Sequence, residues 1–122
     1  MEEGENQTLD RHVLDELAAS VNDDREFVAH LVETYLADSA EHVDSVEAAV
    51  DAGDAQALVR PAHTLKSSSA TVGAARLATV ARRLEAAGRS GEIDEEARSV
   101  ASALRADWEA AVEELRAWMA GE

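Results

Sequence analysis

Apolar residues recur at intervals of three and four positions along almost the whole chain, and short polar breaks separate the repeating stretches. This spacing gathers apolar side chains on one face of an α-helix, whereas a half-buried strand would alternate apolar and polar positions. The chain is rich in Ala, Glu, Leu, Val and Arg and has a single Pro, which also favours helices. The pattern predicts an all-α fold with helices over residues 8–21, 23–52, 54–72, 75–87 and 94–119.

The polar breaks contain residues that begin and end helices. Thr8 is a candidate N-cap for the first helix, and Asp23 with Glu26 three residues later has the form of a capping box. The pair Gly53-Asp54 supplies a glycine to end one helix and a carboxylate to begin the next. We therefore expect short connections between successive helices.

Two further features interrupt the pattern. Pro61 is expected to interrupt or kink the third helix, and residues 88–91 begin and end with glycine and are expected to form a loop. Helices joined by short loops pack antiparallel to their neighbours. The sequence thus predicts an antiparallel four-helix bundle with a short extra N-terminal helix, as a single domain over residues 8–122 that follows a flexible tail over residues 1–7.

Composition excludes several classes of function. The chain has 122 residues, no Cys and a formal net charge of −15. Disulfides and thiolate chemistry are therefore excluded, and a nucleic acid or an anionic membrane surface is a poor partner for so acidic a protein. The polar N-terminus has no apolar segment like that of a signal peptide. We expect a cytoplasmic protein.

The net charge conceals a contrast within the chain. Residues 60–89 hold six basic side chains and one acidic side chain, a net charge of +5. The remaining residues hold five basic and 25 acidic side chains, a net charge of −20. These cations are either ordinary solvated helix surface or, taken as a cluster, an anion-binding region.

The histidines give no sign of a metal site. No Glu lies three residues before any of the four, so the Glu-x-x-His motif of metal-binding bundles is absent. His12, His30 and His42 have acidic neighbours and are expected to be structural or to face solvent. We expect neither a metal ion nor another cofactor in this chain.

His63 differs from the other histidines in its surroundings. Arg60, Lys66, Ser67 and Ala70 share its helical face, at spacings of three, four and seven residues. The opposite face is the expected buried stripe: Leu58, Ala62, Leu65, Ser69 and Val72. An exposed neutral imidazole beside cations can accept a phosphoryl group, although the same cations also occur as plain surface charge.

The residues around His63 resemble a known signature. Residues 62–74 read AHTLKSSSATVGA, which is similar to the A-H-x-L-K-G-S-[AS]-x-x-[LIV]-G-A pattern of histidine-containing phosphotransfer (HPt) domains. Residues 84–91 read LEAAGRSG and resemble the L-E-x-A-x-R-x-G stretch of the same family. The resemblance extends over roughly residues 8–119.

The resemblance implies roles for individual residues. His63 matches the phosphorylated histidine, and Lys66 matches the lysine that holds the phosphoryl oxygens. Glu85 matches a Gln or Glu that hydrogen-bonds the imidazole, which would leave Nε2 as the nucleophile. Gly73 matches a glycine that lets two helices come close, and Arg89 is either part of the site or surface charge.

The chain departs from the signature at one position beside the histidine. Ser67 stands where the family usually has Gly, and its small hydroxyl side chain is expected to modulate transfer rather than abolish it. Arg60, Ser67 and Ala70 are expected, with Gly73 and Arg89, to surround the phosphohistidine where a partner docks.

The function implied by the resemblance is that of a phosphorelay intermediate. His63 would take a phosphoryl group from an aspartate of one receiver domain and pass it to another receiver, in response regulators or hybrid sensor kinases. The Mg²⁺ would belong to the receiver. The chain has no P-loop or other ATP-binding motif, so we expect a carrier without kinase machinery, and a monomer. The initial Met mildly favours a free-standing protein.

Two alternatives remain open from the residues. An inactive HPt-like adaptor would dock to receivers without phosphoryl turnover, and a plain acidic helical adaptor would have no phosphate role. His63, Lys66 and the basic stretch together argue against the second alternative.

Overall fold

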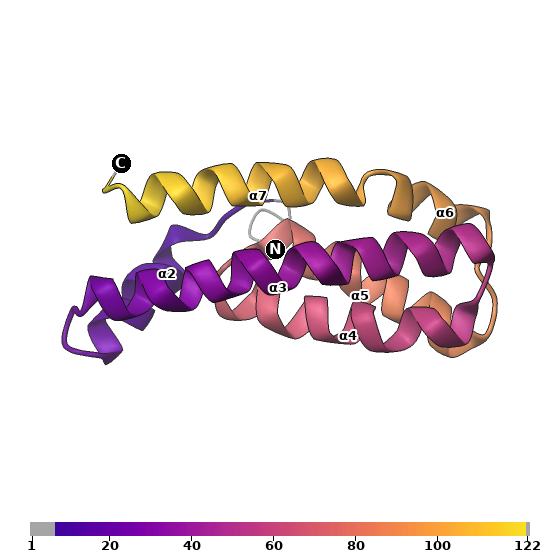
Figure 1. The fold of residues 1–122 in the computed structure, drawn as a ribbon, viewed down its shortest axis with the longest axis horizontal. Helices are drawn as coiled ribbons and strands as arrows, with labels where there is room; N and C mark the ends of the chain where they lie inside the picture. The colour runs from indigo at the N-terminus through magenta and orange to yellow at the C-terminus, as the bar shows by residue number, and fades with distance from the viewer. Residues whose placement is uncertain (1–6, 122) are drawn as a thin grey trace.

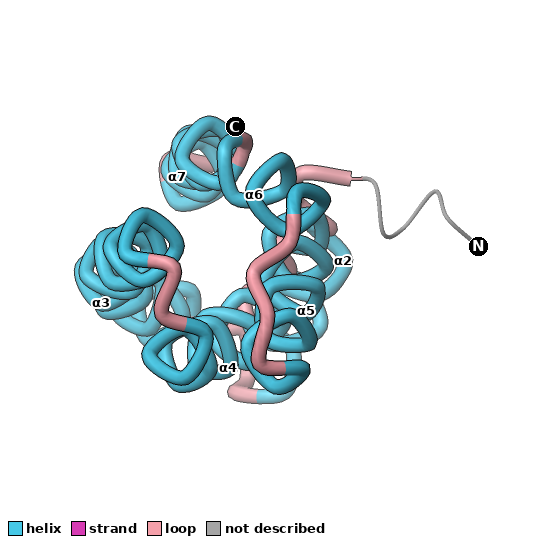
Figure 2. The backbone as a smooth tube through the Cα atoms, turned by 90° about the vertical axis from the view of Figure 1, so that its right-hand side faces the viewer, coloured by secondary structure: helices cyan, strands magenta, loops and turns pink. Residues whose placement is uncertain are grey.

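The computed structural model describes residues 7–121, which contain helices and no strand. The helices are α2 (Arg11–Ser20), α3 (Arg25–Ala52), α4 (Ala55–Thr71), α5 (Ala75–Ser90), α6 (Glu95–Ser102) and α7 (Leu104–Met119). Seen end-on, α3, α4, α5 and the α6–α7 pair surround a common core, and the short α2 lies at one end (Figures 1 and 2). The predicted all-α bundle with an extra N-terminal helix is confirmed. Most of the predicted flexible tail lies outside the described residues.

The core is built from aliphatic side chains of every helix. All five residues of the stripe predicted on α4 are buried, and Leu14, Leu77, Leu104 and Leu115 complete the centre from other helices. The most extensive packing is between α4 and α5. These two helices carry the basic stretch and the expected site, so the best-packed pair of the bundle supports the residues of interest. None of the described helices is long and apolar enough to cross a lipid bilayer.

The first two helices begin at different caps from those predicted. Asp10 caps α2 by accepting a hydrogen bond from the His12 N–H, and this places Leu9 and Leu14 in the positions of a hydrophobic staple. Asp24 caps α3 through the Phe27 N–H. Asp23 instead has a φ of 59° and donates its N–H to the Ala18 carbonyl, so it ends α2. The predictions for Thr8 and Asp23 were wrong because a neighbouring aspartate takes the cap.

The predicted boundary between α3 and α4 is confirmed. Gly53 ends α3 in the left-handed conformation, with a φ of 67°, and the Asp54 carboxylate accepts a hydrogen bond from Ala57 N at 3.1 Å. Helix α4 then continues through Pro61 without the predicted interruption. Proline removes one backbone donor, and the packing of α4 against α3 and α5 keeps the helix intact at this cost.

The predicted loop over residues 88–91 begins too early, because α5 continues through Gly88 to Ser90. A Cβ atom on Gly88 would lie 2.9 Å from the Ala55 carbonyl oxygen and 2.9 Å from Val59 Cγ2. Gly88 is therefore the position at which α4 and α5 come close together. A glycine that looks like a helix terminator in the sequence is required here by packing.

The last predicted helix is divided into α6 and α7 at Ala103. The Ser102 hydroxyl donates to the Ser99 carbonyl at 2.7 Å, and the Ala103 N–H donates to Val100, one residue short of the α-helical partner. A serine that occupies a helix carbonyl in this way competes with the backbone ladder. This local competition accompanies the break, which apolar periodicity alone does not indicate.

Candidate functional site

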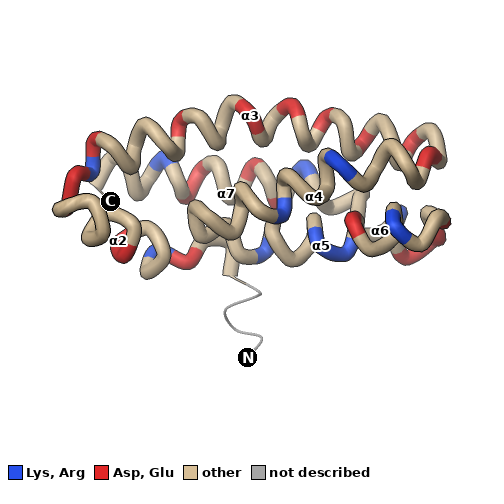
Figure 3. Tube along the Cα trace, turned by 90° about the horizontal axis from the view of Figure 1, so that it is seen from below, with Lys and Arg blue, Asp and Glu red and all other residues tan. Residues whose placement is uncertain are grey.

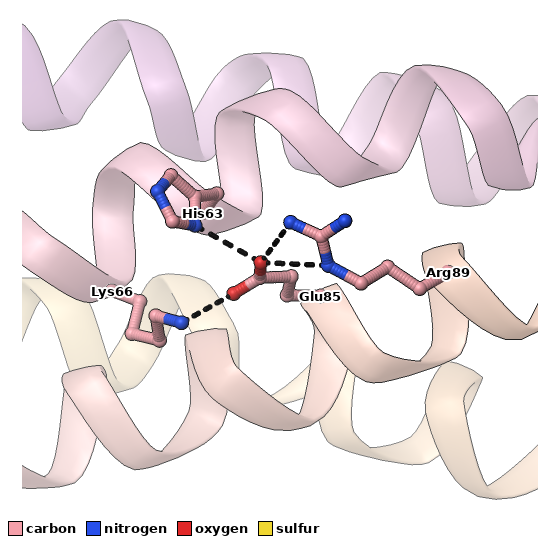
Figure 4. Close-up of polar contacts among 4 residues, drawn as sticks. All are labelled: His63, Lys66, Glu85 and Arg89. Carbon is pink, nitrogen blue, oxygen red and sulfur yellow. Dashed lines mark hydrogen bonds and ion pairs between the residues drawn. The ribbon is translucent and has the colours of Figure 1, made fainter.

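Helices α4 and α5 bring four polar side chains together at their outer junction. His63 and Lys66 come from α4, and Glu85 and Arg89 come from α5 (Figure 4). The spacings of three residues on α4 and four residues on α5 put both members of each pair on one helical face. Because the two helices pack closely at Gly88, these faces meet at their edge.

The Glu85 carboxylate is the centre of the cluster. Its Oε1 lies 2.7 Å from Lys66 Nζ, and its Oε2 lies 3.0 Å from His63 Nδ1. Arg89 donates to the same Oε2 from Nε at 2.9 Å and from Nη2 at 2.6 Å. Only 7% of the Glu85 side chain is exposed, so this carboxylate is a buried acceptor shared by three donors.

These donors lower the pKa of Glu85 to about 2. The hydrogen bond from Lys66 is the largest cause, and hydrogen bonds from Arg89 and His63 add to it. Burial acts in the opposite direction and is outweighed. Glu85 is therefore ionised at neutral pH and acts only as an acceptor.

The carboxylate determines which nitrogen of His63 is free to react. An ionised Glu85 accepts and does not donate, so His63 Nδ1 carries the proton of this hydrogen bond. In a neutral ring Nε2 then holds the lone pair, and Figure 4 shows it turned away from Glu85. The His63 side chain is 52% exposed. The arrangement exposes Nε2 of His63 to solvent as an oriented nucleophile. Lys66 lies beside it and can bind an anionic group.

Side-chain hydrogen bonds join α3 to α4 and, separately, α3 to α7. The Tyr35 hydroxyl lies 2.7 Å from Ser69 Oγ, and Trp108 Nε1 donates to Ser39 Oγ at 2.8 Å. Burial raises the pKa of Tyr35 to about 12, so the phenol remains protonated. From the sequence, Ser69 is predicted only as part of the buried stripe. Its link to α3 depends on the register between two helices, which no motif in the sequence indicates.

The other expected residues of the site take two positions. Arg60, Ser67 and Ala70 are exposed on α4, on the outer face that carries His63. Gly73 is buried after α4, with a φ of 81°, and a Cβ there would lie 2.6 Å from the Asp10 carbonyl oxygen. Gly73 therefore allows a close approach to the start of α2. The close contact between α4 and α5 falls at Gly88, for which the sequence predicted only a loop.

The remaining histidines lie apart from this cluster. His12 pairs with Glu16 at 3.0 Å on the surface of α2, and His30 is exposed on α3. His42 is partly exposed and lines a hollow between α3 and α4. Within residues 7–121, no three side chains of His, Cys, Asp or Glu are grouped closely enough to hold a metal ion.

The comparisons with known proteins agree with this geometry. Residues 30–118 match the family model described as the Hpt domain. Among solved structures, the chain is similar to histidine-containing phosphotransfer protein B (HptB) from Pseudomonas aeruginosa PAO1, with 30% sequence identity and a TM-score of 0.82. The match covers 96% of this chain and 98% of that chain. The search of curated proteins gives no match.

Proposed function

Because this chain belongs to the Hpt domain family, the histidine phosphotransfer proteins of phosphorelays, we propose that His63 is the residue that carries the phosphoryl group. The observation that carries this assignment is the contact between His63 Nδ1 and Glu85, which leaves an exposed Nε2 next to Lys66. The other described histidines lack this combination, since no lysine accompanies them.

The proposed step is an in-line transfer from an aspartyl phosphate of a receiver domain. His63 Nε2 donates its lone pair to phosphorus, the bond from phosphorus to the aspartyl oxygen breaks, and the aspartate leaves as a carboxylate. The imidazole ring becomes cationic, and the ionised Glu85 stabilises that charge through the Nδ1 proton. Reversal of the same step onto a second receiver returns the ring to its neutral state.

Lys66 is proposed to stabilise the transferred group without leaving Glu85. An ammonium group has three N–H donors, and the contact with Glu85 Oε1 at 2.7 Å uses one of them. Another donor can then reach a phosphoryl oxygen on Nε2. Arg89 also touches Glu85, so we assign it a positioning role: it helps to hold the carboxylate in place beneath the ring.

The proposed partners are receiver domains of response regulators or hybrid sensor kinases, and any Mg²⁺ belongs to the receiver. The chain itself is proposed to be a phosphoryl carrier without kinase activity. The expectations of a monomer in the cytoplasm remain predictions.

Intact mass spectrometry tests the assignment directly. The protein is incubated with receiver domains that have been phosphorylated with acetyl phosphate and Mg²⁺. We expect one acid-labile, alkali-stable phosphoryl group on the wild-type chain and none on His63→Gln. His12→Gln is the matched control, because His12 is also exposed and also lies 3.0 Å from a glutamate; this variant should be labelled like the wild type. A stable complex with no label on the wild-type chain would instead support the docking-only alternative.

A further inference from the structure

Two arginines outside the Glu85 cluster lie on either side of His63. Arg60 is three residues before His63 on α4, and Arg82 is three residues before Glu85 on α5. Both side chains are exposed. Neither has an ion pair or a hydrogen bond with any part of the chain that the structure describes. Their charges are therefore available to a partner.

The helical spacing places these arginines on opposite flanks of the histidine. Arg60 borders a hollow with His42 and Ser45, so it lies on the side of α4 that faces α3. Arg82 shares the face of α5 that carries Glu85 and Arg89, so it lies on the other side of His63. Because α4 and α5 are antiparallel, the two arginines are also displaced in opposite directions along the bundle.

The surface of α4 that follows His63 is open. Ser67 and Ala70 are exposed on the outer face of α4, and neither has a long side chain. A partner surface can therefore approach His63 Nε2 closely while its edges reach Arg60 on one flank and Arg82 on the other. We call Arg60 and Arg82 the cationic rim.

The acidic charge of the rest of the chain favours the orientation in which a partner approaches His63. Outside residues 60–89 the net charge is −20, from five basic and 25 acidic side chains. Figure 3 shows acidic positions along α3 and basic positions on α4 and α5. An acidic partner is thus repelled in most orientations and attracted in the orientation that presents it to His63.

We propose that Arg60 and Arg82 dock the partner protein by binding carboxylates that surround its phosphoryl group. This inference rests on the proposed function and adds the chemistry of the partner: a surface with more Asp and Glu than Lys and Arg around its phosphorylated aspartate. Lys66 and Arg89 act on the transferred group and its acceptor. The rim acts on docking.

Arg83 provides a matched control for the rim. It is adjacent to Arg82 and also exposed, but it borders a hollow with Asp94, Glu96 and Ala97, on the side of α5 that faces α6. Arg82→Glu and Arg83→Glu therefore make the same change in net charge on the same helical turn. Only the first changes the surface beside His63.

The test measures binding and transfer with a single receiver domain, the one that binds the wild type most tightly among those encoded in the same genome. At low ionic strength we expect Arg60→Glu and Arg82→Glu each to raise the Kd and the half-saturating receiver concentration about tenfold. The transfer rate at saturating receiver should stay within about twofold of wild type. The effect should shrink as salt approaches about 0.3 M, because screening shortens the range of charge interactions. Arg83→Glu should behave like the wild type.

Other outcomes would overturn the inference. Equal weakening by Arg83→Glu would show that only net charge matters, and unchanged binding by both rim variants would show that the rim does not dock. A loss of saturated transfer rate with unchanged Kd would assign the arginines to the chemical step. Absence of transfer by the wild type would refute the proposed function separately, since the binding measurements still report on the rim.

Discussion

Gly88→Ala separates two effects that act in opposite directions on stability. Gly88 lies inside α5, where replacing glycine by alanine favours the helix by about 1 kcal/mol. The new Cβ, however, would lie 2.9 Å from the Ala55 carbonyl oxygen and 2.9 Å from Val59 Cγ2, whereas ordinary contacts begin at 3.4 Å. The carbonyl is backbone and cannot rotate away.

Packing should therefore outweigh helix propensity. Forcing an extra carbon into a well-packed contact costs about 1–3 kcal/mol, and a rigid backbone neighbour favours the upper part of that range. Subtracting the gain in propensity leaves an expected net destabilisation of about 1–2 kcal/mol, measured as the free energy of unfolding in urea by far-UV circular dichroism. The same shift should separate α5 from α4 and slow phosphoryl transfer to His63, since Glu85 and Arg89 move with α5.

Ala86→Gly is the control for this prediction. Ala86 is exposed on the same helix, so its replacement should cost only the difference in propensity, about 1 kcal/mol. A Gly88→Ala variant as stable as the wild type, or more stable, would refute the argument that close helix packing requires glycine at this position.

Three further changes test the site and its support. Lys66→Ala should retain full helicity by circular dichroism but slow phosphoryl transfer by about tenfold or more, because a donor to the phosphoryl oxygens is lost; lost helicity would show a packing role. Glu85→Gln should destabilise the protein by about 1–2 kcal/mol at pH 7, a value discounted for the exposure of Arg89. The pKa of Glu85 is lowered from 4.5 to about 2, so the stabilisation that ionised Glu85 provides is complete above pH 4.5 and is lost as the pH falls toward 2. Urea unfolding across this window should show the free energies of unfolding of the wild type and Glu85→Gln converging. A constant difference between these two free energies would contradict the linkage. Ser69→Ala should lower the free energy of unfolding by about 1–2 kcal/mol because the buried Tyr35 hydroxyl loses its 2.7 Å partner, and the loss should be smaller in a Tyr35→Phe background.

The periodicity of the sequence predicted the helices well because each must bury one continuous face. The entire α4 stripe from Leu58 to Val72 is buried as expected. Helix ends were less predictable where several capping residues are adjacent. Asp10 and Asp24 are the N-caps in place of the expected Thr8 and Asp23. The N-cap of α2 is the residue whose backbone also packs Leu9 against the core, and Asp23 cannot cap α3 because its backbone ends α2.

The site was predictable to the extent that it lies on one helix. The spacing of His63 and Lys66 identified their shared face, whereas the position of Glu85 came from the resemblance to HPt domains. Contacts between helices depend on their register, which a single sequence does not encode in any local pattern. This explains why the roles of Gly88 and of the Tyr35–Ser69 pair emerged only from the structure.

Burial of Glu85 explains how an acidic residue can support the phosphoryl-accepting histidine without repelling the phosphoryl group of a partner. Glu85 is the one acidic residue among residues 60–89, and its side chain is 7% exposed, compared with 33% for Lys66 and 60% for Arg89. Its charge is directed into hydrogen bonds beneath the ring, whereas the cations extend toward solvent. An approaching dianionic phosphoryl group therefore meets the positive ends of these pairs first. The carboxylate acts at short range, through Nδ1, on the charge that forms in the imidazole during transfer.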